Sequence, residues 1–329
     1  MQILILGNSL AAISVCRVLA DNHEIKVITS DTMIATHIEK TIDCQLIYDD
    51  PLAKTAWEQA QIEKCEAVIA LTSNEEKNII ACQIIAKYYH IPLCICNVGG
   101  QYYPHKDALF TDNATKHIVL SVEQLLSIKL EHMLKHHHCQ EVISTAKNHL
   151  YHMSIKLTTA SPLIHQPFKK LTEQLQKHEK CLALYRDGTL QKNTDTLVLT
   201  ENDTVLIVQD AQKSFHNINH LIGKSTPYER IIIAGASQTS IHLLSKIQDE
   251  YTITLIEPDI NKAQQAASLL QNIVVVHGNI NDDDLLQQEG IRTCDAFIAL
   301  STDDENNLAC ALQACNYDVS FVSTLITQE

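Results

Sequence analysis

The sequence lacks the features that mark several large classes of protein. None of its apolar runs approaches the length that a membrane span needs, and its start, "MQILILG", has no basic segment of the kind that opens a signal peptide. Positive charge is scarce, because 25 Lys and Arg stand against 39 Asp and Glu, a net charge of −14. Phosphate backbones and anionic lipid repel such a chain, so nucleic acid is not an expected partner.

Cysteine pairs at redox or metal-binding spacing are also missing. The chain has eleven cysteines, an odd number, and no C-x-x-C pair. Several of them (Cys65, Cys94, Cys96 and Cys294) lie inside apolar runs. This usage predicts reduced, buried thiols in a cytoplasmic protein. With 329 residues, 45% of them hydrophobic, the chain is long enough for two or three domains with cores of their own.

An internal repeat organises the chain. Gly7 corresponds to Gly235, 228 residues later, and "CEAVIALTSNEEKN" (65–78) corresponds to "CDAFIALSTDDENN" (294–307), 229 residues later. Two matched segments about sixty residues apart, at nearly one offset, indicate duplication of a single unit.

Each copy alternates between strand-like and helix-like segments. In the first copy the apolar runs "QILILG", "EIKVIT", "DCQLIY", "AVIALT" and "PLCICNV" predict buried strands, and amphipathic stretches between them predict helices. Ser9 stands where it could cap the first of these helices. The second copy runs the same way from "RIIIAG" to "VSFVSTLI". Such alternation with short loops predicts a doubly wound parallel sheet of the Rossmann type in each copy.

The segment between the copies has a different texture. Residues 140–210 carry short apolar runs ("LVLT", "TVLIVQ"), a hairpin-like "YRDGTL" and a helix after the prolines of "PLIHQPFKKLTEQLQKHE", which together predict a small α+β lobe of antiparallel strands. We therefore expect a Rossmann-like lobe at 1–135, the small lobe at 136–212, a polar linker at 213–227 and a second Rossmann-like lobe at 228–329. The second copy stops after its fifth strand, with no small lobe behind it, and this predicts altered assembly.

The order of the modules, the pattern T-x-x-x-E-x-N-x-x-A-C at 72–82, and the segments "SVEQLLSIKLEHML" and "SPLIHQPFKKL" resemble the TrkA family, the regulatory subunits of bacterial Trk-type potassium uptake systems. The resemblance covers essentially the whole chain. It implies paired RCK (KTN) domains, binding of NAD or NADH with ATP or ADP as the alternative, and a homo-oligomer. It also implies a cytoplasmic place on the inner face of the membrane, beside a potassium-translocating subunit of the TrkH or TrkG kind.

A dinucleotide fingerprint reads G-x-G-x-x-G, with an acidic residue at the end of the second strand for the ribose hydroxyls. The first copy keeps Gly7 but has Ser9 at the position where the backbone approaches the pyrophosphate, and Thr29 where the acidic residue belongs, with Asp31 two residues on. The arginine that the family usually carries on its fifth strand is also missing. The resemblance places the following nucleotide-contacting positions in the first copy: Gly7, Asn8, Ser9, Leu10, Ala11, Thr29, Asp31, Thr72 and Ser73.

The second copy keeps more of the fingerprint. It has Gly235, again a serine at the close-approach position (Ser237), and Glu257 in the place of the ribose acceptor. We therefore expect the second copy to be the better nucleotide site. Its corresponding positions are Gly235, Ala236, Ser237, Gln238, Thr239, Glu257, Gly278, Asn279, Ser301 and Thr302.

Other chemical patterns are weaker. His132, His136 and Cys139 have a spacing that suggests a metal, but a solvated helix end explains them as well. Tyr102 and Lys106 have the Y-x-x-x-K spacing of short-chain dehydrogenases, but Pro104 disfavours the helix that this requires. The run Asp282–Asp284 fits the start of a helix.

No G-x-S-x-G elbow or P-loop occurs, and no metal site is expected. Together with these absences, the resemblance to the TrkA family implies a non-enzymatic regulator of potassium uptake. An NAD(P)-linked oxidoreductase and a scaffold that has lost its ligand remain as alternatives.

Overall fold

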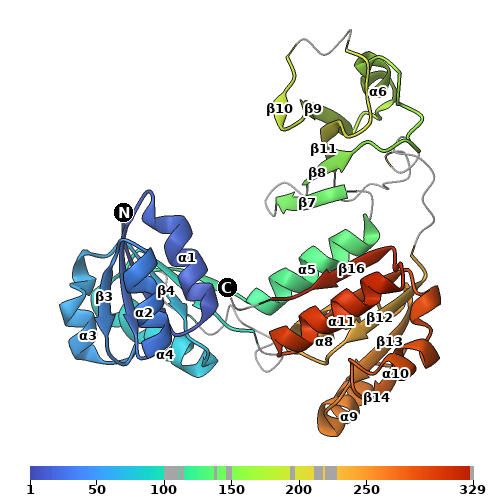
Figure 1. The fold of residues 1–329 in the computed structure, drawn as a ribbon. Coiled ribbons are helices and arrows are strands. Elements are labelled where there is room, and N and C mark those ends of the chain that lie inside the picture. The colour runs from blue at the N-terminus through green and yellow to red at the C-terminus, as the bar shows by residue number, and fades with distance from the viewer. Residues whose placement is uncertain are drawn as a thin grey trace. The chain divides into compact units, whose positions relative to one another are not determined.

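The computed structural model describes residues 1–99, 110, 115–136, 139–145, 150–192, 197–210, 218 and 228–326. The chain divides into two compact units, one spanning Met1–Leu125 and the other Leu126–Leu325. In Figure 1 the colour runs from blue in the first unit to red at the end of the second. No helix within the described part of the chain is both long and apolar enough to cross a bilayer.

The first unit is built on a six-stranded parallel sheet in the order β3-β2-β1-β4-β5-β6. Its continuous apolar runs form strands that are buried on both faces, as a parallel sheet covered by helices requires. Along the chain its elements are β1 (Gln2–Gly7), α1 (Leu10–Ala20), β2 (Glu24–Thr29), α2 (Thr32–Thr41), β3 (Gln45–Tyr48), α3 (Lys54–Gln59), the short 3₁₀ helix η1 (Ile62–Lys64), β4 (Ala67–Leu71), α4 (Glu75–Tyr89), β5 (Leu93–Asn97) and β6 (Lys116–Leu120).

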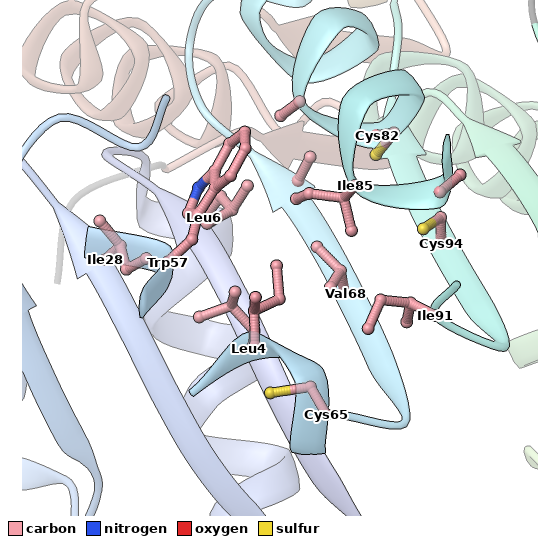
Figure 2. Packing of buried hydrophobic residues seen from close by; sticks show 14 of the residues in the cluster. Leu4, Leu6, Ile28, Trp57, Cys65, Val68, Cys82, Ile85, Ile91 and Cys94 are labelled. Atoms are coloured by element: carbon pink, nitrogen blue, oxygen red, sulfur yellow. The ribbon is translucent and has the colours of Figure 1, made fainter. Parts of the chain in front are cut away.

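The sheet of the first unit separates two hydrophobic layers. Ile3 and Ile5 of β1 face the layer that holds α1 and α2, whereas Leu4 and Leu6 face the layer that holds α3 and α4. Figure 2 shows the second layer, with Trp57 of α3 beside the strands. Because side chains alternate between faces along a strand, one apolar run serves both layers.

Helix α5 (Val122–Lys135) leads from the first unit into the second, where a small antiparallel sheet follows in the order β10-β9-β11-β8-β7. This sheet and α6 enclose a core of their own. The elements are β7 (Cys139–Thr145), β8 (Leu150–Lys156), α6 (Phe168–Gln174), β9 (Glu179–Arg186), β10 (Thr189–Leu190) and β11 (Thr204–Asp210).

The second repeat is a five-stranded parallel sheet in the order β14-β13-β12-β15-β16. Helices α8 and α9, together with Leu134 of α5, cover one face, and α10 and α11 cover the other. Its elements are β12 (Arg230–Ala234), α8 (Gln238–Ile247), β13 (Thr252–Glu257), α9 (Ile260–Leu269), β14 (Val274–His277), α10 (Asp283–Gln288), the 3₁₀ helix η4 (Ile291–Thr293), β15 (Ala296–Ala299), α11 (Asp304–Asn316) and β16 (Phe321–Thr324).

The predicted fold class is confirmed: two doubly wound parallel sheets flank a small antiparallel lobe. The hairpin tip of "YRDGTL" is also as expected, since Thr189 pairs with Arg186 across a turn with positive φ at Asp187 and Gly188. Two details differ. "KHIVL" forms β6, a sixth strand of the first sheet, and "LVLT" contributes only an isolated bridge at Val198.

Some of the sequence-based expectations concern residues that the structure does not describe. The Tyr102–Lys106 pattern lies outside the described residues, as does most of the expected linker at 213–227. Within that linker only Ile218 is described, and it is buried in the core of the small lobe.

Candidate functional site

In each repeat a fully buried asparagine, Asn78 or Asn307, bonds to the carboxyl ends of neighbouring strands. The Asn307 amide accepts a hydrogen bond from Ser301 N (2.8 Å) and donates to the carbonyl oxygens of Ser301 and Leu325 (both 2.9 Å). Asn78 of the first repeat accepts from Thr72 N (2.9 Å) and donates to Thr72 O and Asn97 O (both 3.0 Å). The asparagine of the T-x-x-x-E-x-N pattern is therefore structural, because it ties the start of a helix to the ends of two strands.

The crevice of the second repeat opens between β12 and β15, where the strand order reverses. Ligands of doubly wound folds bind at the carboxyl ends of the strands at such a point. Gly235 makes the turn there with φ +97°, and a Cβ on it would lie 2.5 Å from the backbone of Ser301. Only glycine satisfies both the conformation and the close approach.

Ser237 occupies the start of α8. Its hydroxyl accepts a hydrogen bond from Ser240 N (3.3 Å), and its carbonyl accepts one from Ile241 N (3.0 Å). The amides of Gln238 and Thr239 belong to the first turn, for which a helix supplies no acceptor of its own. An anion at this helix end would meet those amides and the positive end of the helix dipole.

Glu257, at the end of β13, is 5% exposed and braces the glycine turn. Its Oε2 accepts from Ala236 N (2.6 Å) and its Oε1 accepts from Asp259 N (2.9 Å). Each carboxylate oxygen can accept a second hydrogen bond, so both oxygens keep capacity for a ligand hydroxyl.

Ser237 and Glu257 line a common cavity of about 610 Å³. That volume lies within the range typical of small-molecule sites. Six of the residues predicted from the sequence line it: Ser237, Glu257, Gly278, Asn279, Ser301 and Thr302. Four others (Gly235, Ala236, Gln238 and Thr239) form the turn and the first turn of α8 without lining the cavity.

The sequence prediction missed the remaining residues of the cavity wall: Pro258, Asp259, Lys262, His277, Ile280, Asn281, Asp303 and Asn306. Asp259 could have been found, since it holds the same position relative to Glu257 as Asp31 does to Thr29. The other residues gave no linear signal. Asn281 and Asn306, for example, meet through a 2.6 Å hydrogen bond although they are 25 residues apart.

The corresponding turn of the first repeat is arranged differently. Asn8 Oδ1 accepts from Ser73 N (2.8 Å), and Ser9 Oγ donates to Leu71 O (2.6 Å). The expectation that Ser9 caps α1 is therefore wrong, because its hydroxyl bonds to the end of β4 instead of to a helix amide. A Cβ on Gly7 would lie 2.4 Å from that of Ala12, so this glycine allows α1 to pack against β1.

The other predicted residues of the first repeat have local partners. Thr29 is fully buried, and its hydroxyl accepts from Asp31 N (3.2 Å). Asp31 caps α2, accepting from Met33 N and Ile34 N. Thr72 is held by Asn78, Leu10 begins α1, and Ala11 lies in its first turn.

The sequence suggested that His132 of α5 and His136, the residue directly after α5, lie at a solvated helix end, and this is wrong. His132 and His136 are 8% and 7% exposed and pack against Tyr151 of β8. Burial lowers the pKa of His132. No group of three or more metal-binding side chains able to hold an ion occurs within the described residues.

The aspartates at 282–284 and the cysteines behave as the sequence predicted. Asp282 caps α10 through Asp284 N (3.0 Å). All eleven cysteines are free, and most are buried. Burial raises the pKa of the Cys16 thiol to about 12, so this thiol is inert at neutral pH.

Taken together, the fold and the cavity define the class of protein. Two doubly wound lobes, with Glu257 and the start of α8 beside one cavity at the switch point of the second, make this a duplicated Rossmann-type protein.

A family model described as the TrkA-N domain matches residues 3–120 and 231–326, which are the two parallel-sheet repeats. The chain therefore belongs to the TrkA-N domain family. The "Trk system potassium uptake protein TrkA" of Vibrio alginolyticus is 23% identical over 331 residues, covering 99% of this chain and 72% of that protein. The protein of the same name from Haemophilus influenzae is 23% identical, covering 95% and 69%.

Solved structures share the fold. The GsuK RCK domain superposes with a TM-score of 0.70 at 17% identity, covering 98% of this chain and 69% of that one. A GsuK channel bound to NAD gives a TM-score of 0.69 at 18% identity, covering 98% and 57%. The resemblance to the TrkA family that the sequence suggested is thus confirmed.

Proposed function

We propose that this chain is a nucleotide-responsive regulatory subunit of a Trk-type potassium uptake system and that it has no enzymatic activity of its own. The observation that carries the proposal is the cavity of the second repeat, where Glu257 and the start of α8 face a common space in a TrkA-N protein. Its place would be cytoplasmic, on the inner face of the membrane, as a homo-oligomer beside a potassium-translocating subunit of the TrkH or TrkG kind. The names of the TrkA relatives support this partner.

NAD or NADH is the ligand that we assign to this cavity, with ATP or ADP as the alternative. GsuK, which shares the fold, has been solved bound to NAD and bound to ADP. The residues present fit such a ligand: Glu257 can accept from ribose hydroxyls, and the first turn of α8 can receive phosphate oxygens. A 2′-phosphate would meet the carboxylate of Glu257, so we expect NADP to bind more weakly than NAD.

Helix α8 provides a physical route from the cavity to the rest of the second unit. Its N-terminal end borders the cavity, and Lys246 in its last turn pairs with Glu131 of α5 (3.4 Å). Lys135 of α5 pairs with Glu250, just beyond α8 (2.7 Å). A ligand that moves α8 would therefore change the ion pairs and the packing that hold α5.

Regulation requires that the ligand bind two arrangements of the lobes with different affinities. A ligand that binds both equally well shifts nothing, however tightly it binds. The proposal thus predicts that bound nucleotide changes amide exchange along α8 and α5 as well as at the cavity.

Isothermal titration with NADH, and separately with ATP, tests the ligand assignment. Glu257→Ala should weaken binding by about tenfold or more, since it removes a charge-assisted acceptor. Thr29→Ala, at the matched position of the first repeat, should leave the affinity unchanged. Equal losses in both variants would show that the site is assigned to the wrong repeat.

The same experiment separates the alternatives. Binding without turnover supports the regulator. No heat with either nucleotide supports a scaffold that has lost its ligand, and hydride transfer from NADH to a substrate supports an oxidoreductase. Copurification with a potassium-translocating subunit from membranes tests the partner.

A further inference from the structure

The two repeats place the same backbone groups at their crevices, which permits a comparison atom by atom. Ser73 of the first repeat corresponds to Thr302 of the second, 229 residues later in the matched segments after the fourth strands. Ser73 N already donates to Asn8 Oδ1 at 2.8 Å. Thr302 lines the open cavity, and alanine, which has no acceptor, stands at position 236 where the first repeat has Asn8.

The glycine turns of the two repeats also differ in how far they stay paired with the neighbouring strand. In the first repeat Gly7 is still part of β1 and pairs with Leu71 of β4, and Ser9 Oγ donates to Leu71 O. In the second repeat the ladder ends at Ala234, which pairs with Ala299, and Gly235 leaves the strand with φ +97°. The turn of the first repeat is therefore bonded to the end of the neighbouring strand across the switch point.

Ser9 and Ser237 show how one residue type serves two purposes. Both follow the glycine by two positions. Ser237 turns its hydroxyl to Ser240 N at the start of its own helix, whereas the hydroxyl of Ser9 is bonded to Leu71 O, on the facing strand. The two serines thus differ in the partner of the hydroxyl, which is the neighbouring strand for Ser9 and the serine's own helix for Ser237. The sequence alone does not reveal this difference.

We propose that the first repeat is closed by its own side chains and that the chain binds one nucleotide, in the second repeat only. Asn8 is the deciding residue, because its amide oxygen takes the place of a ligand acceptor at Ser73 N. Thr29 reinforces the difference, since its buried hydroxyl serves Asp31 N where the second repeat presents a carboxylate. This inference rests on the proposed function and adds to it the number of ligands and the residue that sets it.

An asymmetric pair of repeats has a consequence for regulation. If only the second repeat binds and releases the ligand, the first repeat keeps the same conformation with and without nucleotide. Ligand-dependent changes in amide exchange should then be confined to the second unit and should leave β1, α1 and β4 unaffected.

The first test is the stoichiometry of NADH binding to the full chain, measured by titration calorimetry. One site per chain is expected, and Glu257→Ala should weaken its affinity by about tenfold or more. Two sites per chain would overturn the inference while leaving the proposed function standing. Absence of binding to NADH and to ATP would remove both.

The second test introduces into the second repeat the asparagine that closes the first. Ala236→Asn places an amide opposite Thr302 N, as Asn8 stands opposite Ser73 N, and should weaken NADH binding by about tenfold or more. Ala236→Ser is the matched control, because its shorter side chain adds polarity without the reach, and it should retain the wild-type affinity. Wild-type affinity in Ala236→Asn, or an equal loss in Ala236→Ser, would refute the role assigned to the asparagine.

The third test opens the closed repeat. In the Glu257→Ala background, Asn8→Ala with Thr29→Glu gives the first repeat the alanine and the glutamate that the second repeat has at these two positions. It should restore one site of wild-type affinity per chain. Thr29→Glu alone should not restore it, because Asn8 still occupies Ser73 N. Equal restoration by Thr29→Glu alone would show that Asn8 does not close the crevice. Thermal melts confirm in each case that the variant is folded.

Discussion

Replacement of Asn78 by alanine should destabilise the first repeat strongly, although the residue contacts no proposed ligand. Asn78 is fully buried, and the change would leave the N–H and the carbonyl of Thr72 and the carbonyl of Asn97 without their partner. An unsatisfied buried backbone group costs about 1 kcal/mol at the low end of the measured range, so these three groups together should cost about 3 kcal/mol.

The single tryptophan of the chain makes this measurable. Trp57 lies in the core of the first repeat, where its Nε1 donates to Pro51 O (2.8 Å), so its fluorescence reports unfolding of that repeat (Figure 2). With a urea dependence of about 2 kcal/mol per molar, the midpoint should fall by about 1.5 M.

Asn74→Ala is the matched control for this prediction, because it removes the same side chain from the same helix. Asn74 makes one capping hydrogen bond, to Lys77 N (2.7 Å), and its loss should cost about 1 kcal/mol. If Asn78→Ala shifts the urea midpoint no further than Asn74→Ala, the hydrogen bonds of Asn78 do not stabilise the repeat as the geometry implies, and the reasoning fails.

Three further predictions concern the rest of the chain. Gly235→Ala should cost more than about 2 kcal/mol, because it adds a backbone clash to a strained φ, whereas Gly188→Ala, at φ +74° with open space around it, should cost only about 1 kcal/mol; amide exchange would show whether the two differ. Burial alone would raise the pKa of Asp203, but the Arg186 guanidinium (2.8 Å) holds it below its usual value. The small lobe should therefore lose stability as pH falls below about 4, and Asp203→Asn should lose less over the same range, as thermal melts between pH 7 and pH 3 would reveal. Cys315 is the one exposed thiol among the eleven cysteines, all of them within the described residues, and should react first with a thiol reagent; a fast phase that persists in Cys315→Ser would contradict this order, because the other thiols are buried or half-buried.

The fold was accessible from the sequence because a parallel sheet leaves a strong signal. Runs such as "ILIL" and "IIIA" are apolar at every position, since both faces of the strand are covered, and helix-like segments separate them. Strand β6 was missed for a related reason. "KHIVL" lies beyond the fifth strand, and its half-buried side chains give no comparable run.

The candidate site was only partly accessible. The glycine turn and Glu257 stand at fixed distances from a predicted strand, so the sequence locates them. The walls contributed by Lys262, His277 and Asn281 come from three other segments, which meet only because the carboxyl ends of parallel strands share one edge.

For His132 of α5 and His136, directly after it, the sequence predicted exposure where the structure has burial. A polar run at the end of a helix reads as solvated when only the helix itself is considered. Packing against Tyr151 of β8, on a different element, buries both His132 and His136.

By itself the sequence determined that the chain is duplicated, that each copy is a doubly wound sheet, and that an acidic residue at the end of the second strand is present in only one copy. These properties can be read from the sequence because they depend on residues that are close together along the chain. Only the tertiary structure decided what the serine after each glycine does. Ser9 and Ser237 both stand two residues after the glycine of the turn, yet one hydroxyl bonds across the switch point and the other bonds to its own helix. That choice depends on how far β1 pairs with β4 and β12 with β15, which is a contact between segments more than sixty residues apart.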